Sequence, residues 1–71
     1  MTYKFTAIIT REGKFFISEC PELGITSHGL SLDEALENLK EAIHLFLKDE
    51  DIAELSLPTA SPLVTTVEVA V

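Results

Sequence analysis

A proline corner that leads through a short strand into a capped amphipathic helix is the feature that most constrains this chain. Pro21 has no amide hydrogen, so it ends a strand ladder and turns the chain. Gly24 and Gly29 bound a short β-branched stretch with the composition of a strand. Ser31 and Glu34 have the spacing of a capping box, in which the Ser31 hydroxyl accepts from the amide of residue 34 and Glu34 reaches back to the amide of Ser31. We expect these five residues to define the fold locally.

The helix that follows this cap is predicted over residues 32–48. Apolar side chains recur there at steps of three and four residues, which places them on one stripe of a helix. The stripe consists of Leu32, Ala35, Leu36, Leu39, Ala42, Ile43 and Phe46. Charged side chains lie off the stripe, so the helix is expected to cover one face of a sheet.

Before the helix, three stretches have the pattern of strands. Residues 2–11 and 14–20 alternate and predict a hairpin around Gly13, which can adopt the positive φ that a tight turn needs. The register of this hairpin stays open, because both faces of the second strand begin with a phenylalanine. The third predicted strand covers residues 25–29.

After the helix, residues 49–62 are predicted to be a linker that Pro58 and Pro62 keep irregular. Residues 63–71 alternate and are rich in valine, which predicts a fourth strand. The element order is then β-β-β-α-β, a two-layer α+β fold with one helix on a four-stranded sheet. A right-handed crossover gives the mixed sheet order 3-2-1-4, as in a truncated ribonuclease-H-like fold.

In that order the fourth strand is an open edge that carries Val67, Val69 and Val71. An exposed edge of this kind tends to pair with another chain. A 71-residue chain also buries only about 60% of its unfolded surface, and its single cysteine allows no internal disulfide. We therefore expect a homodimer or homotetramer in which this edge strand takes part.

The composition narrows the class of partner. The net charge is −7, from 12 acidic and 5 basic side chains. Direct nucleic-acid binding needs clustered Lys and Arg, so we do not expect it. Such a charge suits a basic protein partner. The sequence has neither a signal-peptide pattern nor a membrane-spanning run, so a cytoplasmic protein that does not engage a membrane is expected.

The sequence offers no constellation of residues for catalysis, a metal or a cofactor, and none is expected. A two-metal nuclease of this fold needs a carboxylate on the first strand, and residues 2–10 contain no acid. Cys20 lies beside Glu19 and Glu22, which is the wrong setting for a reactive thiol. His28 has no recognisable partner for catalysis, although a small hydrolase or nuclease that uses His28 is a remaining, weaker alternative.

Two consecutive stretches resemble the HicB family of type II antitoxins. Residues 16–29 read FISECPELGITSHG and residues 31–43 read SLDEALENLKEAI. The family pattern has a Cys-Pro-Glu-Leu-Gly corner, a strand that ends in Gly, and a helix with Thr/Ser-x-x-Glu-Ala-x-x-Asn-x-x-Glu-Ala. The resemblance extends over about residues 3–48. It implies a partial ribonuclease-H fold without nuclease activity, formed here as a single domain over residues 1–71.

The resemblance also implies a partner, a small basic RNA-cleaving toxin of the HicA type that the antitoxin binds and neutralises. Many HicB proteins add a DNA-binding segment, and this chain is expected to be a short form without one. A stand-alone oligomeric HicB-like protein with no toxin is the main alternative. The candidate contact residues for a basic partner are Glu19, Glu22, His28, Asp49, Glu50 and Asp51.

Overall fold

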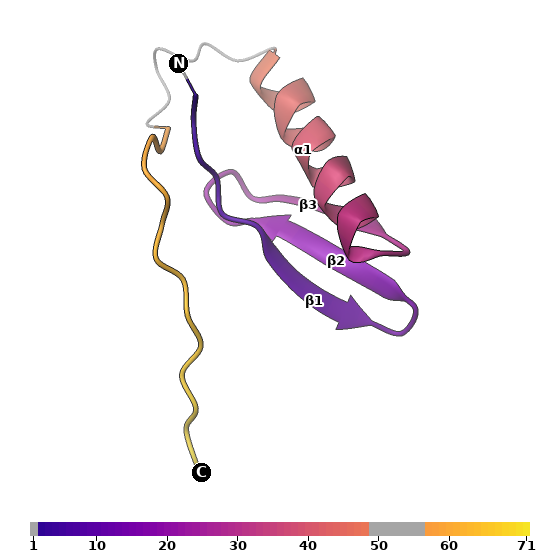
Figure 1. The fold of residues 1–71 in the computed structure, drawn as a ribbon, viewed down its shortest axis with the longest axis vertical. Coiled ribbons are helices and arrows are strands. Elements are labelled where there is room, and N and C mark those ends of the chain that lie inside the picture. The colour runs from indigo at the N-terminus through magenta and orange to yellow at the C-terminus, as the bar shows by residue number, and fades with distance from the viewer. Residues whose placement is uncertain (1, 49–56) are drawn as a thin grey trace.

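The computed structural model describes residues 2–48 and 57–71. Three strands and one helix follow each other along the chain: β1 (Ile8–Glu12), β2 (Phe15–Cys20), β3 (Ile25–Gly29) and α1 (Leu32–Lys48). The strands form an antiparallel sheet in the order β1-β2-β3, and α1 packs across it (Figure 1). The α+β class, the three strands before the helix and the bounds of the helix are confirmed.

A tight turn at Gly13 joins β1 to β2 and sets their register. Gly13 has φ +60° and no non-glycine residue in the described chain has a positive φ, which is the pattern of a type II′ turn with glycine in its first central position. Glu12 then pairs with Phe15, and the ladder continues to Ile8 opposite Glu19. The register that the sequence left open is thereby resolved.

The proline corner joins β2 to β3. Gly24 has φ +67°, and its amide donates to the carbonyl oxygen of Cys20 across 2.9 Å. An L-amino acid with a β-carbon is strained at that φ, so glycine suits this position. The corner returns the chain antiparallel to β2, with Ile25 opposite Cys20 and Gly29 opposite Phe16.

The helix begins with a cap that differs from the expected one in a single bond. The Ser31 hydroxyl accepts from the amide of Glu34 across 3.1 Å, as the capping box predicts. The Glu34 carboxylate, however, accepts from the amide of Leu30 across 3.1 Å, where the amide of Ser31 was expected. Glu34 therefore holds the residue that precedes the cap, which fixes the angle at which the chain enters the helix.

The helix packs mainly over β2 and β3. Cys20 and Ala35 are fully buried between the layers, and Leu39 is almost so. The buried Ser18 hydroxyl donates across 2.9 Å to the carbonyl oxygen of Ala35, which joins β2 to α1. A β-carbon on Gly29 would lie 2.6 Å from the amide nitrogen of Ala35, so the close approach of β3 and the helix requires glycine there. The core is consequently small and displaced away from β1.

The predicted fourth strand is not formed. Residues 57–71 are described without any strand, so the order 3-2-1-4 is realised only as far as β3-β2-β1. The alternation in residues 63–71 specifies an extended chain but not the strand beside which it lies. The amide of Lys4 donates to the carbonyl oxygen of Pro58 across 2.8 Å, and beyond that point the C-terminal segment diverges from β1 (Figure 1).

The first predicted strand is also shorter than expected. β1 begins at Ile8, whereas residues 2–11 were predicted. Its partner β2 ends at Cys20, because Pro21 has no amide to continue the ladder, and residues 2–6 consequently lack a strand to pair with. Of the predicted linker, residues 49–56 lie outside the described chain and residues 57–62 contain no helix or strand.

Candidate partner-binding face

The side of the sheet that faces away from α1 is largely exposed. Residues that pair across an antiparallel ladder share a face, and Ser18 and Cys20 define the helix side because both are buried there. The β2 residues that alternate with these two point to the other side of the sheet. Together with their cross-strand partners, they make up that side. This open face consists of Ile8, Thr10, Glu12, Phe15, Ile17, Glu19, Thr26 and His28.

Three apolar side chains lie among the polar ones on the open face. Ile8 and Phe15 are 38% and 37% exposed, and Ile17 lies half-buried between them on the central strand. The Phe15 ring meets the His28 ring edge-on, with 5.6 Å between centroids and 88° between planes. The Lys14 ammonium lies 5.6 Å from the centroid of Phe15. The face thus combines apolar and polar side chains, with an aromatic pair at the end near the β1–β2 turn.

Two predicted contact residues, Glu19 and His28, lie on this face, and both are exposed. Glu19 is on the central strand, opposite Ile8 on one side and Thr26 on the other, so its carboxylate lies between the two outer strands of this face. Glu12 lies at the far end of β1 on the same face. The backbone carbonyl of His28 accepts from the side-chain amide of Asn38 across 2.8 Å, which ties β3 to the helix.

Glu22, a third predicted contact residue, binds within its own chain. Its carboxylate accepts from the amide of Thr6 across 3.0 and 3.1 Å and from the Thr6 hydroxyl across 2.5 Å. The hydrogen bond from the Thr6 hydroxyl is the main reason that the pKa of Glu22 lies below its ordinary value, with the Thr6 amide adding to the effect. Glu22 therefore attaches the N-terminal segment to the proline corner.

The Cys20 thiol lies behind the open face, within the core. It is buried and donates to the Glu22 carboxylate across 3.5 Å. Burial raises the pKa of Cys20, and the hydrogen bond to Glu22 raises it further. A thiol that stays protonated is a weak nucleophile, so Cys20 has the properties of a packing residue.

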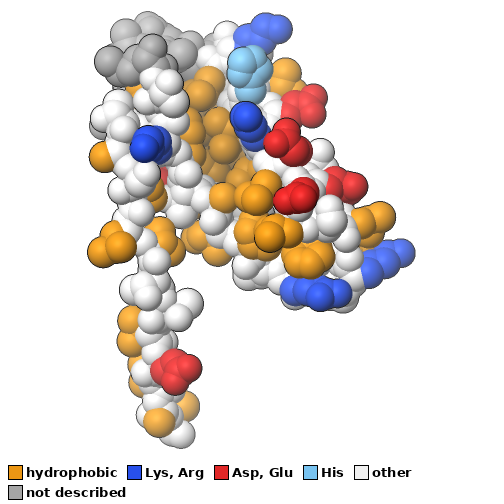
Figure 2. Space-filling view, in the orientation of Figure 1, with side chains coloured by type: hydrophobic (Ala, Val, Ile, Leu, Met, Phe, Trp, Pro, Cys, Tyr) orange, Lys and Arg blue, Asp and Glu red, His pale blue; other side chains and the backbone are white. Residues whose placement is uncertain are grey.

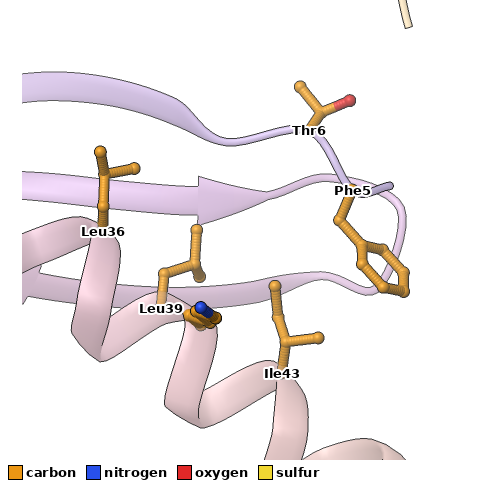
Figure 3. A pocket seen from close by; sticks show the side chains of 6 residues that line it. Phe5, Thr6, Leu36, Leu39 and Ile43 are labelled. Atoms are coloured by element: carbon orange, nitrogen blue, oxygen red, sulfur yellow. The ribbon is translucent and has the colours of Figure 1, made fainter. Parts of the chain in front are cut away.

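The structure also shows an apolar groove on the helix side, beside the edge of the sheet where β1 lies. The groove is lined by Phe5, Thr6, Leu36, Leu39, Lys40 and Ile43 and has a volume of about 200 Å³ (Figure 3). It exists because α1 extends over β2 and β3 and leaves the β1 side without cover. Figure 2 shows hydrophobic side chains between the helix and the chain segments beside it.

Sequence reasoning missed Phe15 and Ile17 as surface residues, because it left the register of the hairpin open. It also missed Thr6, since no local pattern links Thr6 to Glu22 across the sequence. Asp49, Glu50 and Asp51 lie outside the described residues. Within residues 2–48 and 57–71, no three His, Cys, Asp or Glu side chains are grouped as a metal site would require. No helix in that part of the chain is both long and apolar enough to cross a bilayer.

Together, the helix-covered sheet and its bare outer face define a small α+β protein with an exposed surface suited to contact. The chain is similar to a UPF0150 protein of Helicobacter pylori (strain J99 / ATCC 700824), with 36% identity over 66 residues, which cover 90% of this chain and 92% of that protein. The chain belongs to the UPF0150 family. No protein-family model and no solved structure matches it.

Proposed function

We propose that this chain is a non-catalytic antitoxin module of the HicB type, which binds and neutralises a small basic RNA-cleaving toxin of the HicA type. Two lines of similarity support the proposal. The corner-and-helix motif around Pro21 and Ser31 resembles HicB proteins, and the UPF0150 family is related to them.

The observation that carries the proposal is the open face of the sheet. On this face Ile8 and Ile17 lie beside the exposed carboxylates of Glu12 and Glu19, in a chain of net charge −7. A protein interface combines an apolar centre with a polar rim, and opposite charge speeds the encounter of the partners. A basic protein would be attracted by the charge and held by the apolar side chains of this face.

The proposal is tested with a small basic RNA-cleaving protein of the HicA type, produced together with the chain. We expect a stable complex whose association rate falls as salt is added, because charge steering is screened. Co-expression should restore growth that the basic protein alone prevents. The absence of a complex at low salt would contradict the proposal and favour a stand-alone protein.

A matched pair of variants locates the contact. Glu19→Lys changes the charge on the open face, and Glu37→Lys makes the same change on exposed helix surface. We expect Glu19→Lys to weaken the complex by about tenfold or more, since like charges across an interface repel. Glu37→Lys should weaken it far less. Equal effects would mean that only net charge matters and that the open face is not the contact.

A further inference from the structure

We propose that two copies of this chain exchange their C-terminal segments, so that residues 63–71 of each copy lie along the β1 edge and in the apolar groove of the other. Residues 63–71 are called the C-terminal arm below. The inference concerns assembly alone and does not depend on a toxin. It rests on the exposure of the arm, the shape of the groove and the way in which the arm leaves the body.

The arm presents apolar side chains that contact almost nothing in their own chain. Leu63 is 99% exposed, Val67 82% and Val69 75%. Alternation places Leu63, Thr65, Val67, Val69 and Val71 on one face of an extended chain. Soluble proteins seldom leave so many neighbouring apolar side chains in water, and such a strip marks a contact site.

The sheet has a free edge at β1 that could accept such a segment. The edge of β1 that faces away from β2 has no strand beside it in the described part of the chain. The groove lined by Phe5, Leu36, Leu39 and Ile43 lies on the helix side of that same edge (Figure 3). An extended segment beside β1 would satisfy the edge with its backbone and fill the groove with one apolar face, as occurs when a strand is added to a sheet.

The occupant is the arm of a second copy, because the chain's own arm points elsewhere. The bond between Lys4 and Pro58 holds the residues that precede the arm beside the N-terminal segment, after which the arm runs away from the body (Figures 1 and 2). Pro58 and Pro62 fix their own φ and keep the residues before them extended, which favours a straight exit over a return. The radius of gyration is 13.8 Å, against about 11 Å for a compact chain of this length.

Exchange of an identical element between copies is a low-cost route to a dimer. It also explains why a strand-like sequence in residues 63–71 has no strand beside it in a single chain. The expected product is a twofold dimer in which each groove is filled from the partner.

Sedimentation of the full chain between micromolar and hundred-micromolar concentration tests the assembly. We expect a species of twice the 7.8 kDa chain mass. The double variant Val67→Lys/Val69→Lys should raise the dimer dissociation constant by at least ~100-fold, because four buried valines are lost per dimer. The control Thr66→Lys/Ala70→Lys adds the same charge to the opposite face of the arm. It should change the dimer dissociation constant far less. A monomeric wild-type chain, or equal effects of the two variants, would overturn the proposal.

A mixed sample of isotope-labelled and unlabelled chain identifies the partner of the arm without any substitution. Isotope-filtered NOEs from Val67 and Val69 of one copy to Phe5 and Ile43 of the other are expected. NOEs found only within a chain would show that the arm folds back on its own groove. NOEs found only between two arms would show that the arms pair with each other. Either result would overturn the exchange.

Discussion

The hydroxyl of Ser18 on β2 donates a 2.9 Å hydrogen bond to the carbonyl oxygen of Ala35 on α1, and both residues are fully buried. This bond crosses the layer between sheet and helix at the centre of a small core. It satisfies a hydroxyl that would otherwise be buried without a partner. The packing of Cys20 and Leu39 beside it depends on the same spacing between layers.

Ser18→Ala should lower the free energy of unfolding by about 1 kcal/mol, the net value of a typical hydrogen bond within a protein. The Ala35 carbonyl keeps its hydrogen bond within the helix. The loss in the free energy of unfolding should therefore not be much larger than the contribution of the single bond from Ser18. Urea unfolding followed by circular dichroism measures it. Glu37→Gln on the exposed helix surface is the control and should leave the midpoint almost unchanged. An unaltered stability of Ser18→Ala would show that the bond contributes nothing.

Gly29→Ala should destabilise the fold by about 1–3 kcal/mol, the usual range for forcing an extra group into packed surroundings. The added β-carbon would lie 2.6 Å from the Ala35 nitrogen and 2.9 Å from Glu34, and the backbone there cannot move aside without shifting the helix cap. Thermal unfolding measures the effect.

Gly24→Ala provides a contrast to this overpacking. A β-carbon at Gly24 meets nothing within 4 Å, so its cost comes from the positive φ alone, on the order of 1 kcal/mol. Gly24→Asn should recover part of that loss, because asparagine tolerates the left-handed region, whereas Gly29→Asn should recover nothing. If Asn rescued both positions equally, the steric explanation at Gly29 would be wrong.

Glu22 should make the stability of the fold depend on acid. Its pKa is lowered in the folded state from an ordinary value of 4.5, chiefly by the Thr6 hydroxyl. A group with a lowered folded pKa contributes stability that is present above its unfolded pKa and is lost as the pH falls through the folded pKa. Glu22→Gln should therefore lower stability at neutral pH and reduce the loss on acidification below pH 4.5.

Urea midpoints at neutral and acidic pH check this, with Glu37→Gln on the exposed helix surface as the control. Thr6→Val should reproduce part of the Glu22→Gln effect, because it removes the hydroxyl donor. Identical acid dependence in the wild type and in Glu22→Gln would contradict the role assigned to this carboxylate.

Cys20 should react slowly with a thiol reagent in the folded protein. The thiol is buried, and burial together with Glu22 raises its pKa, so both access and the thiolate fraction are reduced. Labelling by a disulfide reagent should become fast when urea unfolds the chain. Rapid labelling under native conditions would show that the thiol is accessible, in conflict with its position in the core.

The helix and the proline corner could be predicted from sequence because local interactions determine them. The Ser31 cap and the stripe from Leu32 to Phe46 are properties of neighbouring residues, and the helix has the predicted bounds. The third strand, between the corner and Gly29, also matches its prediction. In each case the residues that specify the element lie within or beside it.

The features that were not predicted correctly from the sequence depend on contacts between residues that are distant in the sequence. Residues 63–71 have the alternation of a strand, but no local pattern states which edge they join, and they pair with none in this structure. The bond from Thr6 to Glu22 spans sixteen positions and leaves no trace in the pattern around either residue. The open face could be resolved only once the turn at Gly13 had fixed the register, which placed Glu19 and His28 together.

The position of α1 over β2 and β3, away from β1, has a consequence for hydrogen exchange. Amide protons of β2 have a strand on each side and the helix above, so they should exchange most slowly with solvent deuterium. Those of β1 that face outward should exchange fast in dilute solution and, under the proposed exchange of arms, slow down as the protein is concentrated. Comparing the protection of backbone amides in each strand at different protein concentrations would thus show whether another segment covers the outer edge of β1.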